Sequence, residues 1–299
     1  SPTYRLGELI RNGVKCVAIA HESHASKWQS APELTADIID LYSQKVGAYA
    51  YPKMVVADAF SGMEYPMLTM NSDNAPDYAY IFSHEVGHNW FFGMVGSNET
   101  YRALLDEGFT QFLTVYALEN LQERGPISTP PKSDYLKHFK KKRALRDRFA
   151  YLRYLRHAIS TEGAALNTHS DMFESNSPYG EEYRQTYYKS ATMLFNLEYV
   201  LGEELFDKAL KDYFERWKFC HPYDEDLETS FINSTKTDLN WFFDQFIETT
   251  KEIDYKVVSA RKDKANDAYV IHFKRLGRMQ MPLDFTIIDK KDSIFNYHI

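Results

Sequence analysis

HEVGHNW, residues 84–90, places two histidines four positions apart with a glutamate directly after the first. In a helix, four residues turn the chain by about 400°, so His84 and His88 lie on one face, one turn apart. Two imidazoles in that arrangement can bind one zinc ion. Glu85, about 100° around the helix, can reach a water on the metal without being a ligand. The alternative is a core helix that carries two hydrogen-bonded histidines.

The surrounding sequence favours a metal site. The motif lies in an aromatic, apolar segment, where two unpaired imidazoles and a carboxylate would be costly to bury. A catalytic zinc also needs a third protein ligand and an open position. Glu107, in LLDEGFT, follows His88 after eighteen residues, so a return helix can bring its carboxylate to the histidine pair. A second stretch, HESH at 21–24, has its histidines three apart after an apparent strand, and we interpret it as a polar loop.

Composition limits the class of protein. The 299 residues are 44% hydrophobic and 26% charged, which is typical of a globular chain long enough for two domains. The net charge of -7 argues against a nucleic-acid binder that works through bulk charge. The basic stretch 137–156, with KKKR at 140–143, is either a nucleic-acid or localisation patch or a solvated helix face, and we favour the solvated face. We expect no membrane span, because no run of eighteen apolar residues occurs.

Two cysteines, Cys16 and Cys220, stand far apart without a CxxC pair, which argues against a disulfide framework and a cysteine zinc site. The first residue is serine rather than methionine and no signal-like segment follows. We therefore expect a soluble, processed or truncated chain, which allows an exported or periplasmic protein and leaves the compartment open.

The order of secondary structure predicts an α+β fold. A small mixed α/β part (1–75) precedes a mostly helical part (76–250), and together they form one predicted domain, 1–250. Residues 251–299 have β-branched and aromatic runs separated by turns, and we interpret them as the opening of a β-sandwich. The predicted strands are 14–20, 53–59, 66–70, 255–260, 268–273 and 282–288. The predicted helices are 33–47, 74–96, 101–121, 187–202, 203–217 and 238–250.

Four motifs now support a family resemblance. HEVGH, eighteen residues and the glutamate of LLDEGF resemble the gluzincin aminopeptidases typified by aminopeptidase N, whose pattern is HExxH-x18-E. The aromatic pair at 90–91, which follows the second histidine, is also similar to that family. SGMEY (61–65) resembles the upstream GxMEN exopeptidase motif, and YYKSA (187–191) resembles the downstream YxKGA segment. The matches follow the family's order over about residues 40 to 250, so the resemblance implies a thermolysin-like zinc peptidase domain.

The resemblance implies a catalytic set built on one zinc ion. His84, His88 and Glu107 would hold the ion, which lowers the pKa of its water and polarises the substrate carbonyl. Glu85 would act as the general base and then deliver the proton to the leaving amine. Tyr187 would donate from its phenol to the developing oxyanion.

The motif at 61–65 implies a binding site for the substrate amine. Glu64 would bind the ammonium group of a free peptide N-terminus, which sets cleavage one residue from the amine. Gly62 and Met63 belong to the same substrate-binding segment. The motif departs from the family at Ser61, where glycine is usual, and at Tyr65, where asparagine is usual, and Tyr65 should alter the first side-chain pocket.

Other assignments depend on the resemblance alone. Tyr183 and Tyr188 are neighbours that composition cannot separate from Tyr187, and only the YxK alignment selects Tyr187. Ser190 replaces the family's glycine in that segment. Asp106, next to the proposed ligand Glu107, could orient one of the histidines.

The leading hypothesis is a zinc aminopeptidase that acts on peptides with a free N-terminus. A thermolysin-type endopeptidase shares the zinc pattern but has no use for an ammonium anchor. A catalytically inactive peptide-binding domain would lack a ligand, the base or the tyrosine. Family members also carry a large N-terminal β domain and a C-terminal helical domain, both missing here. We therefore expect this chain to bind zinc but to turn over poorly by itself.

Overall fold

The first part of the computed structural model is a five-stranded sheet in the order β1-β2-β3-β5-β4. Strands β2, β3 and β5 are parallel, and the edge strands β1 and β4 run antiparallel to their neighbours. The structure describes residues 3–72, 78–121, 145–160, 163–173, 182–288 and 293–299. The strands are β1 (Tyr4–Arg11), β2 (Val14–His21), β3 (Lys53–Asp58), β4 (Met63–Tyr65) and β5 (Leu68–Asn71).

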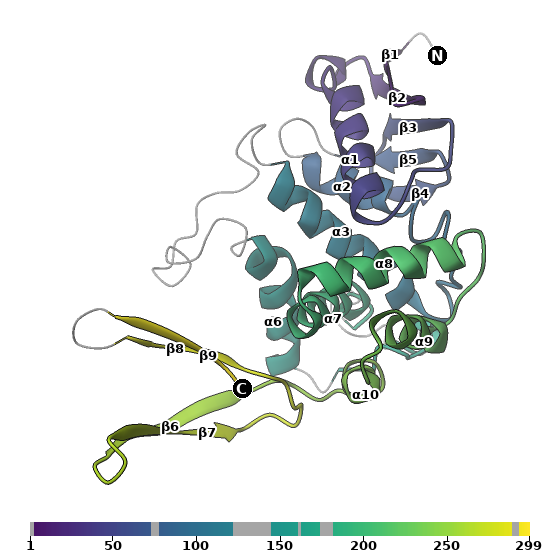
Figure 1. The fold of residues 1–299 in the computed structure, drawn as a ribbon. Helices are drawn as coiled ribbons and strands as arrows, with labels where there is room; N and C mark the ends of the chain where they lie inside the picture. Colours follow the sequence, from purple (N-terminus) through teal and green to yellow (C-terminus); the bar gives the residue numbers. More distant parts are fainter. Residues whose placement is uncertain (1–2, 73–77, 122–144, 161–162, 174–181, 289–292) are drawn as a thin grey trace.

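Helix α1 (Ala31–Lys45) packs on this sheet (Figure 1). Its buried residues include Ile38 and Tyr42, and the strands contribute Met54 and Val56 to the same core. This confirms the strands predicted at 14–20 and 53–59 and the helix predicted at 33–47. Strand β1 was not predicted, because YRLGELIR mixes charged and apolar residues without alternation and lies mostly exposed at the edge.

Most of the remaining chain is helical, and α3 lies at its centre in contact with α2 and α7 (Figure 1). Together with the sheet, this arrangement confirms the predicted α+β class. None of the helices in the described ranges is long and apolar enough to cross a membrane. The helices are α2 (Ala79–Gly87), α3 (Glu107–Asn120), α6 (Leu152–Ser160), α7 (Gln185–Leu201), α8 (Glu203–Trp217), α9 (Asp224–Thr235) and α10 (Asn240–Ile247), with a 3-10 turn at Ala103–Leu105 and a π-helical turn at Asp147–Tyr151.

Two helix predictions need correction. The single helix predicted over 74–96 is wrong in length, because α2 ends at Gly87 and His88 is its C-cap. Beyond it the chain turns, with Phe92 at φ 124° and the amide of Gly93 donating to the carbonyl of His88 over 2.8 Å. The helix predicted over 101–121 begins only at Glu107, after the 3-10 turn. Helix α9 was missed, since its sequence is strongly polar.

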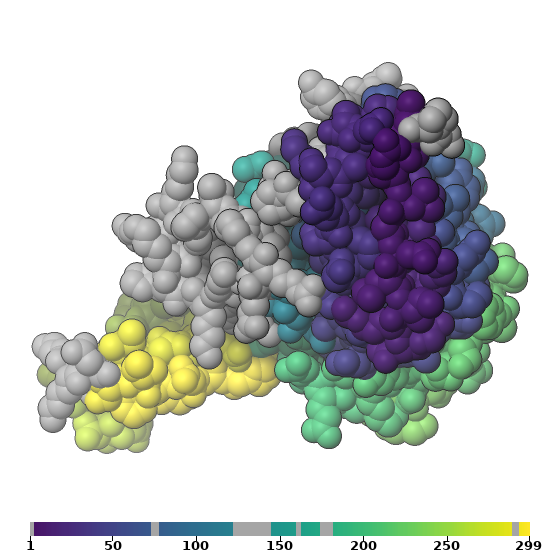
Figure 2. Space-filling model, turned by 90° about the horizontal axis from the view of Figure 1, so that it is seen from above, coloured from purple at the N-terminus to yellow at the C-terminus, as the bar shows by residue number. Residues whose placement is uncertain are grey.

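The C-terminal strands form two hairpins that extend from the helical part (Figures 1 and 2). Strand β6 (Tyr255–Asp263) pairs with β7 (Ala268–Arg275), and β8 (Asp284–Ile288) pairs with β9 (Ile294–His298). The hairpins contact each other through Phe285 of β8, whose ring centroid lies 4.9 Å from that of Phe273 of β7. Within its own hairpin, Phe285 stacks 5.1 Å from Tyr297. Two small sheets at this end of the chain are consistent with the predicted start of a β-sandwich. The domain boundary near residue 250 stays a prediction.

Replacement of Phe109 by alanine should lower the free energy of unfolding by about 3–5 kcal/mol, because it leaves a cavity between helices. Phe109 is fully buried, and its ring stacks 4.4 Å from Phe91 and 5.7 Å from Tyr213. Chemical denaturation measures the change. As a control, Leu6→Ala on the exposed edge strand should change stability by no more than about 0.5 kcal/mol. Equal effects of the two substitutions would contradict this description of the core.

Candidate metal centre

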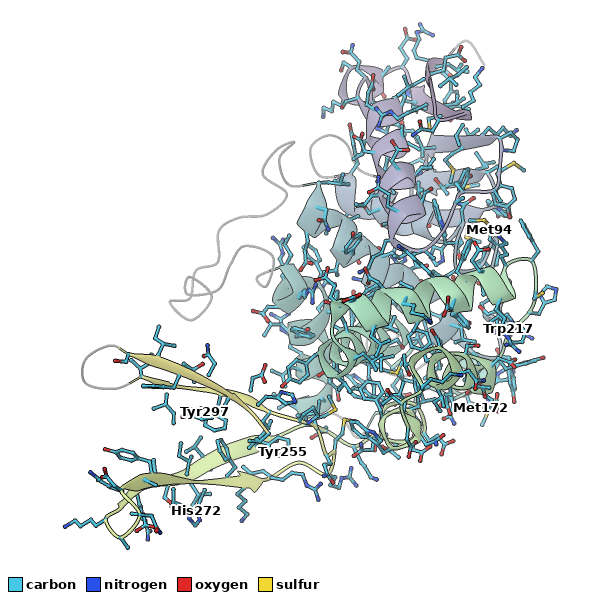
Figure 3. The ribbon with its side chains drawn as sticks, viewed as in Figure 1. Met94, Met172, Trp217, Tyr255, His272 and Tyr297 are labelled. Carbon is cyan, nitrogen blue, oxygen red and sulfur yellow. The ribbon has the colours of Figure 1, made fainter. Side chains whose placement is uncertain are left out.

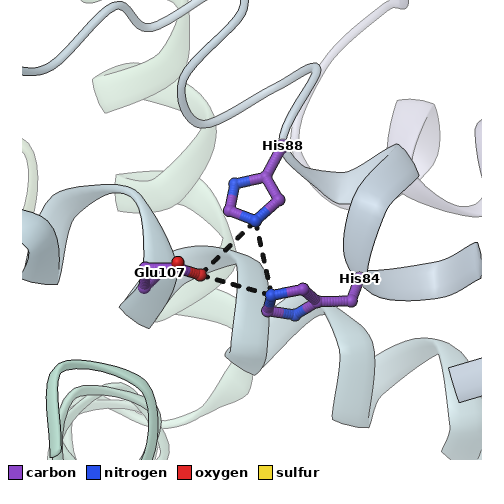
Figure 4. Close-up of side chains that lie close together, drawn as sticks. All are labelled: His84, His88 and Glu107. Carbon is purple, nitrogen blue, oxygen red and sulfur yellow. Dashed lines mark hydrogen bonds and ion pairs between the residues drawn. The ribbon is translucent and has the colours of Figure 1, made fainter. Parts of the chain in front are cut away.

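Three side-chain atoms from α2 and the start of α3 form a nearly equilateral triangle (Figure 4). The Nε2 atoms of His84 and His88 are 3.3 Å apart, and Oε2 of Glu107 lies 3.2 Å from the first and 3.4 Å from the second. Tetrahedral ligands at 2.0–2.1 Å from a zinc-sized ion are themselves about 3.3 Å apart. The triangle therefore has the size that three ligands of one such ion require.

Residues of α3 fix the orientation of both imidazoles. The Nδ1 of His84 lies 3.1 Å from Oγ1 of Thr114, and Nδ1 of His88 lies 2.5 Å from Oδ1 of Asp106 and 3.2 Å from Oγ1 of Thr110. These contacts leave both Nε2 atoms facing Glu107. Asp106 was expected as an orienting partner, whereas Thr110 and Thr114 were not. The signal was present, since positions 106, 110 and 114 repeat every four residues on one face of the helix.

The electrostatics of the cluster favour a bound cation. Burial would raise the pKa of Glu107, but the hydrogen bonds from His84 and His88 outweigh it and hold that pKa below its usual range. Burial raises the pKa of Asp106 well above its ordinary value, although His88 opposes the change. Burial also lowers the pKa of His84. Burial opposes protonation of His88 too, but the neighbouring Asp106 and Glu107 outweigh it and raise the pKa of His88 well above its ordinary value. The carboxylates thus attract positive charge into a space with little water, and a divalent cation would supply such charge.

Glu85 projects from α2 next to the triangle. Burial raises the pKa of its carboxyl to about 8, with an opposing contribution from His88. Its Oε2 is buried and has no hydrogen-bond partner among the described residues. The chain at Gly62 crosses directly over this carboxyl, because a Cβ at position 62 would lie 2.0 Å from Oε1 of Glu85 and 2.9 Å from Cδ1 of Ile81.

Strand β4 brings the sheet edge to the cluster. Its middle residue, Glu64, is half-buried, and a carboxylate oxygen lies within 4.8 Å of ligand atoms of both Glu85 and His88. Burial raises the pKa of Glu64. Met63 and Tyr65 flank it and are exposed, so alternation along the strand turns Glu64 alone toward the triangle.

Of three neighbouring tyrosines, Tyr187 reaches the cluster. Its phenol donates a hydrogen bond to Oε1 of Glu107, and its ring stacks 5.6 Å from that of His84. Burial and the nearby Glu107 carboxylate raise the pKa of Tyr187. Tyr183 packs edge-on against Tyr187, and the hydroxyl of Tyr188 accepts a hydrogen bond from Arg153.

A cleft of about 560 Å³ opens over these groups. His84, Glu85 and Tyr187 lie along its wall, with Gly62 and Arg184 among the other lining residues. Its size suits a few residues of an extended peptide. The HESH stretch at 21–24 contributes to none of the clusters of potential metal ligands within the described residues, and Nδ1 of His24 contacts Asp58 over 2.8 Å.

Comparisons with known proteins agree with this geometry. The family model described as Peptidase family M1 domain matches residues 32–246. The chain is similar to Aminopeptidase 2, mitochondrial, of Saccharomyces cerevisiae, with 24% identity over 253 residues that cover 79% of this chain and 24% of that protein. It is also similar to Aminopeptidase Q of Homo sapiens, with 26% identity over 149 residues that cover 50% of this chain and 14% of that protein.

Solved structures show the same fold. The M1 zinc metallopeptidase from Deinococcus radiodurans superposes with a TM-score of 0.63 and 16% sequence identity, over 82% of this chain and 51% of that chain. A second structure from that organism, the E323A mutant bound to Tyr-Ser-Ala, gives the same TM-score with 15% identity. The chain thus spans about half the length of these structures and a quarter or less of the two curated relatives.

Replacement of Gly62 by alanine should destabilise the fold by about 1–3 kcal/mol, because the new methyl group would collide with Glu85. Most of this cost should disappear in a Glu85→Ala background, since the nearest colliding atoms are then gone. Denaturation of the unmodified protein, the two single variants and the double variant gives four free energies of unfolding. Together they give the interaction energy between positions 62 and 85. Ser61→Ala, in the same exposed turn, is the control. Additive effects of the two substitutions would contradict the close approach.

Proposed function

This chain belongs to peptidase family M1, and we propose that it is the catalytic part of a zinc aminopeptidase that hydrolyses the N-terminal peptide bond of peptides. The observation that carries the proposal is the triangle of His84, His88 and Glu107 with the Glu85 and Glu64 carboxylates beside it. A metal, a base and an amine anchor within a few ångströms are the parts that this reaction needs.

The triangle is proposed to hold one zinc ion. Two imidazoles and a carboxylate are a usual donor set for catalytic zinc, which keeps its fourth position open. When bound, zinc polarises the substrate carbonyl and lowers the pKa of an attacking water. Asp106 and Thr114 fix the imidazole rings from behind, so little reorganisation is needed for binding.

Glu85 and Tyr187 are proposed to move and donate protons. The buried Glu85 carboxyl has a pKa of about 8, close to the pH at which it must first accept a proton and then release it to the leaving amine. None of the residues that the structure describes hydrogen-bonds to its Oε2. The phenol of Tyr187 lies at Glu107, where it can turn its hydrogen toward an oxyanion that develops at the carbonyl.

Glu64 supports exopeptidase rather than endopeptidase activity. Its carboxylate, turned toward the triangle, is placed to bind a substrate ammonium group. An endopeptidase would present neutral backbone at this point, and a buried carboxylate there would weaken its binding. An inactive peptide-binding domain has no need of the base, and Glu85 is retained.

One peptide supplied with either a free or an acetylated N-terminus tests the proposal. Mass spectrometry should show that only the free peptide shortens, one residue at a time, and only in the presence of zinc. Glu64→Gln should lower kcat/KM for the free peptide by roughly 10- to 100-fold, because it removes a charge-assisted contact. Glu204→Gln removes the same charge from an exposed position on α8 and is the matched control. Internal cleavage of both peptides would overturn the aminopeptidase assignment.

Asp106→Asn should weaken zinc affinity by roughly 10- to 100-fold, because His88 loses the carboxylate that orients it. Competition with a chromogenic chelator measures the dissociation constant without reference to activity. Asp267→Asn, at an exposed hairpin turn, removes the same charge and should leave the affinity unchanged. Equal affinities of the Asp106 variant and the unmodified protein would exclude this role.

A further inference from the structure

A second cavity, of about 400 Å³, adjoins the catalytic cleft and is lined by arginines. The arginines are Arg148, Arg153, Arg156 and Arg184, and no aspartate or glutamate is among the described residues that line the cavity. Arg153, Arg184 and Tyr188 border both the cavity and the cleft over His84 and Glu85. The cavity and the cleft are therefore neighbours that share these three side chains.

Three of these four arginines are not explained by the packing of the fold. Arg148, Arg153 and Arg184 make no ion pair with a carboxylate in the described part of the chain. By contrast, Arg146 in the same basic segment pairs with Glu119 over 3.0 Å and with Glu198 over 3.2 Å. In a chain with a net charge of -7, such a concentration of unpaired positive charge runs against the overall balance. The neighbouring guanidinium groups repel one another, and an anionic ligand bound between them would reduce that repulsion.

Two of the arginines face the cleft from different helices. Arg153 lies on α6, and its Nη1 donates to the hydroxyl of Tyr188 over 2.6 Å while its guanidinium lies 5.1 Å from the centre of that ring. Arg184 is the N-cap of α7, three positions before the cleft residue Tyr187. The fork of a guanidinium matches the two oxygens of a carboxylate.

The direction of a bound peptide connects the arginines to the reaction. With its amine at Glu64 and its scissile bond at the triangle, a substrate has its remaining residues in the rest of the cleft. Tyr183, Arg153 and Arg184 line that part. Negative charge on the leaving portion of the peptide would thus meet the arginines and stay away from Glu64 and Glu85.

We propose that Arg148, Arg153 and Arg184 form a subsite for a carboxylate group on the leaving side of the scissile bond. This inference rests on the proposed aminopeptidase function. The carboxylate is either the C-terminus of a short peptide or an acidic side chain that follows the scissile bond. The substrates so selected are short or acidic peptides.

Four peptides of one length and a free N-terminus separate the two sources. The first pair has neutral side chains and ends in a carboxylate or an amide. The second pair ends in an amide and carries glutamate or glutamine after the scissile bond. In at least one pair, the charged peptide should have a higher kcat/KM than its neutral partner. The expected ratio is roughly two- to fivefold for each arginine that contacts the carboxylate. The pair that shows the preference identifies the source.

Single variants connect that preference to the arginines. Arg184→Gln and Arg153→Gln should each reduce the ratio of kcat/KM between the charged and the neutral peptide, because each removes a positive charge from the subsite. Arg216→Gln is the matched control, since Arg216 is exposed at the end of α8, next to Trp217 and across the molecule from α6 (Figures 1 and 3). It should leave the ratio unchanged.

Calorimetry with the same peptides, N-methylated at the scissile bond, gives the ratio of affinities without turnover. If no free peptide is cleaved while charged peptides still bind more tightly through Arg184, the proposed function fails and the subsite stands. Equal kcat/KM and equal affinity within both pairs would overturn the subsite. So would a preference that both arginine variants retain, or tighter binding of a short single-stranded oligonucleotide than of any charged peptide.

Discussion

The close antiparallel contact between α2 and α3 is the constraint on which the site depends. Gly87 allows it, because a Cβ at that position would already lie 3.2 Å from Cγ2 of Thr110. Across this contact the imidazole of His84 meets Thr114, and that of His88 meets Asp106. A small separation of the helices would lengthen the two sides of the triangle that join His84 and His88 to Glu107. The metal geometry is therefore a consequence of helix packing rather than of the HExxH motif alone.

Packing around the helix pair keeps that contact in place and adds the rest of the site. Tyr42 of α1 donates to the carbonyl of Ser83 over 2.8 Å, which ties α2 to the layer that covers the sheet. On the other side α7 approaches α3 so closely that a Cβ on Gly108 would lie 2.3 Å from Cβ of Ser190. That approach places Tyr187 on Glu107. Gly108 supplies the space that the side chain of Ser190 needs.

Much of this arrangement follows from the sequence because its signals are local. The i, i+4 histidines and the glutamate eighteen residues later predict the helix pair, and apolar runs predict β2 and β3. The end of α2 at Gly87 was not predictable in the same way. NWFFGMVG continues the apolar pattern, but tertiary contacts decide its path, such as the 2.7 Å bond from Trp90 Nε1 to the carbonyl of Gly47. The arginine subsite is equally non-local, since Arg153 and Arg184 belong to separate helices that only the folded chain brings together.

X-ray absorption at the zinc K edge tests the central claim, that this helix pair holds one zinc ion through two imidazoles and a carboxylate. The account predicts a first shell of nitrogen and oxygen at about 2.0–2.1 Å, with the multiple-scattering signature of two imidazoles. That signature should fall to one imidazole in His88→Ala. A sulfur shell at about 2.3 Å, or a spectrum unchanged by the substitution, would contradict the account.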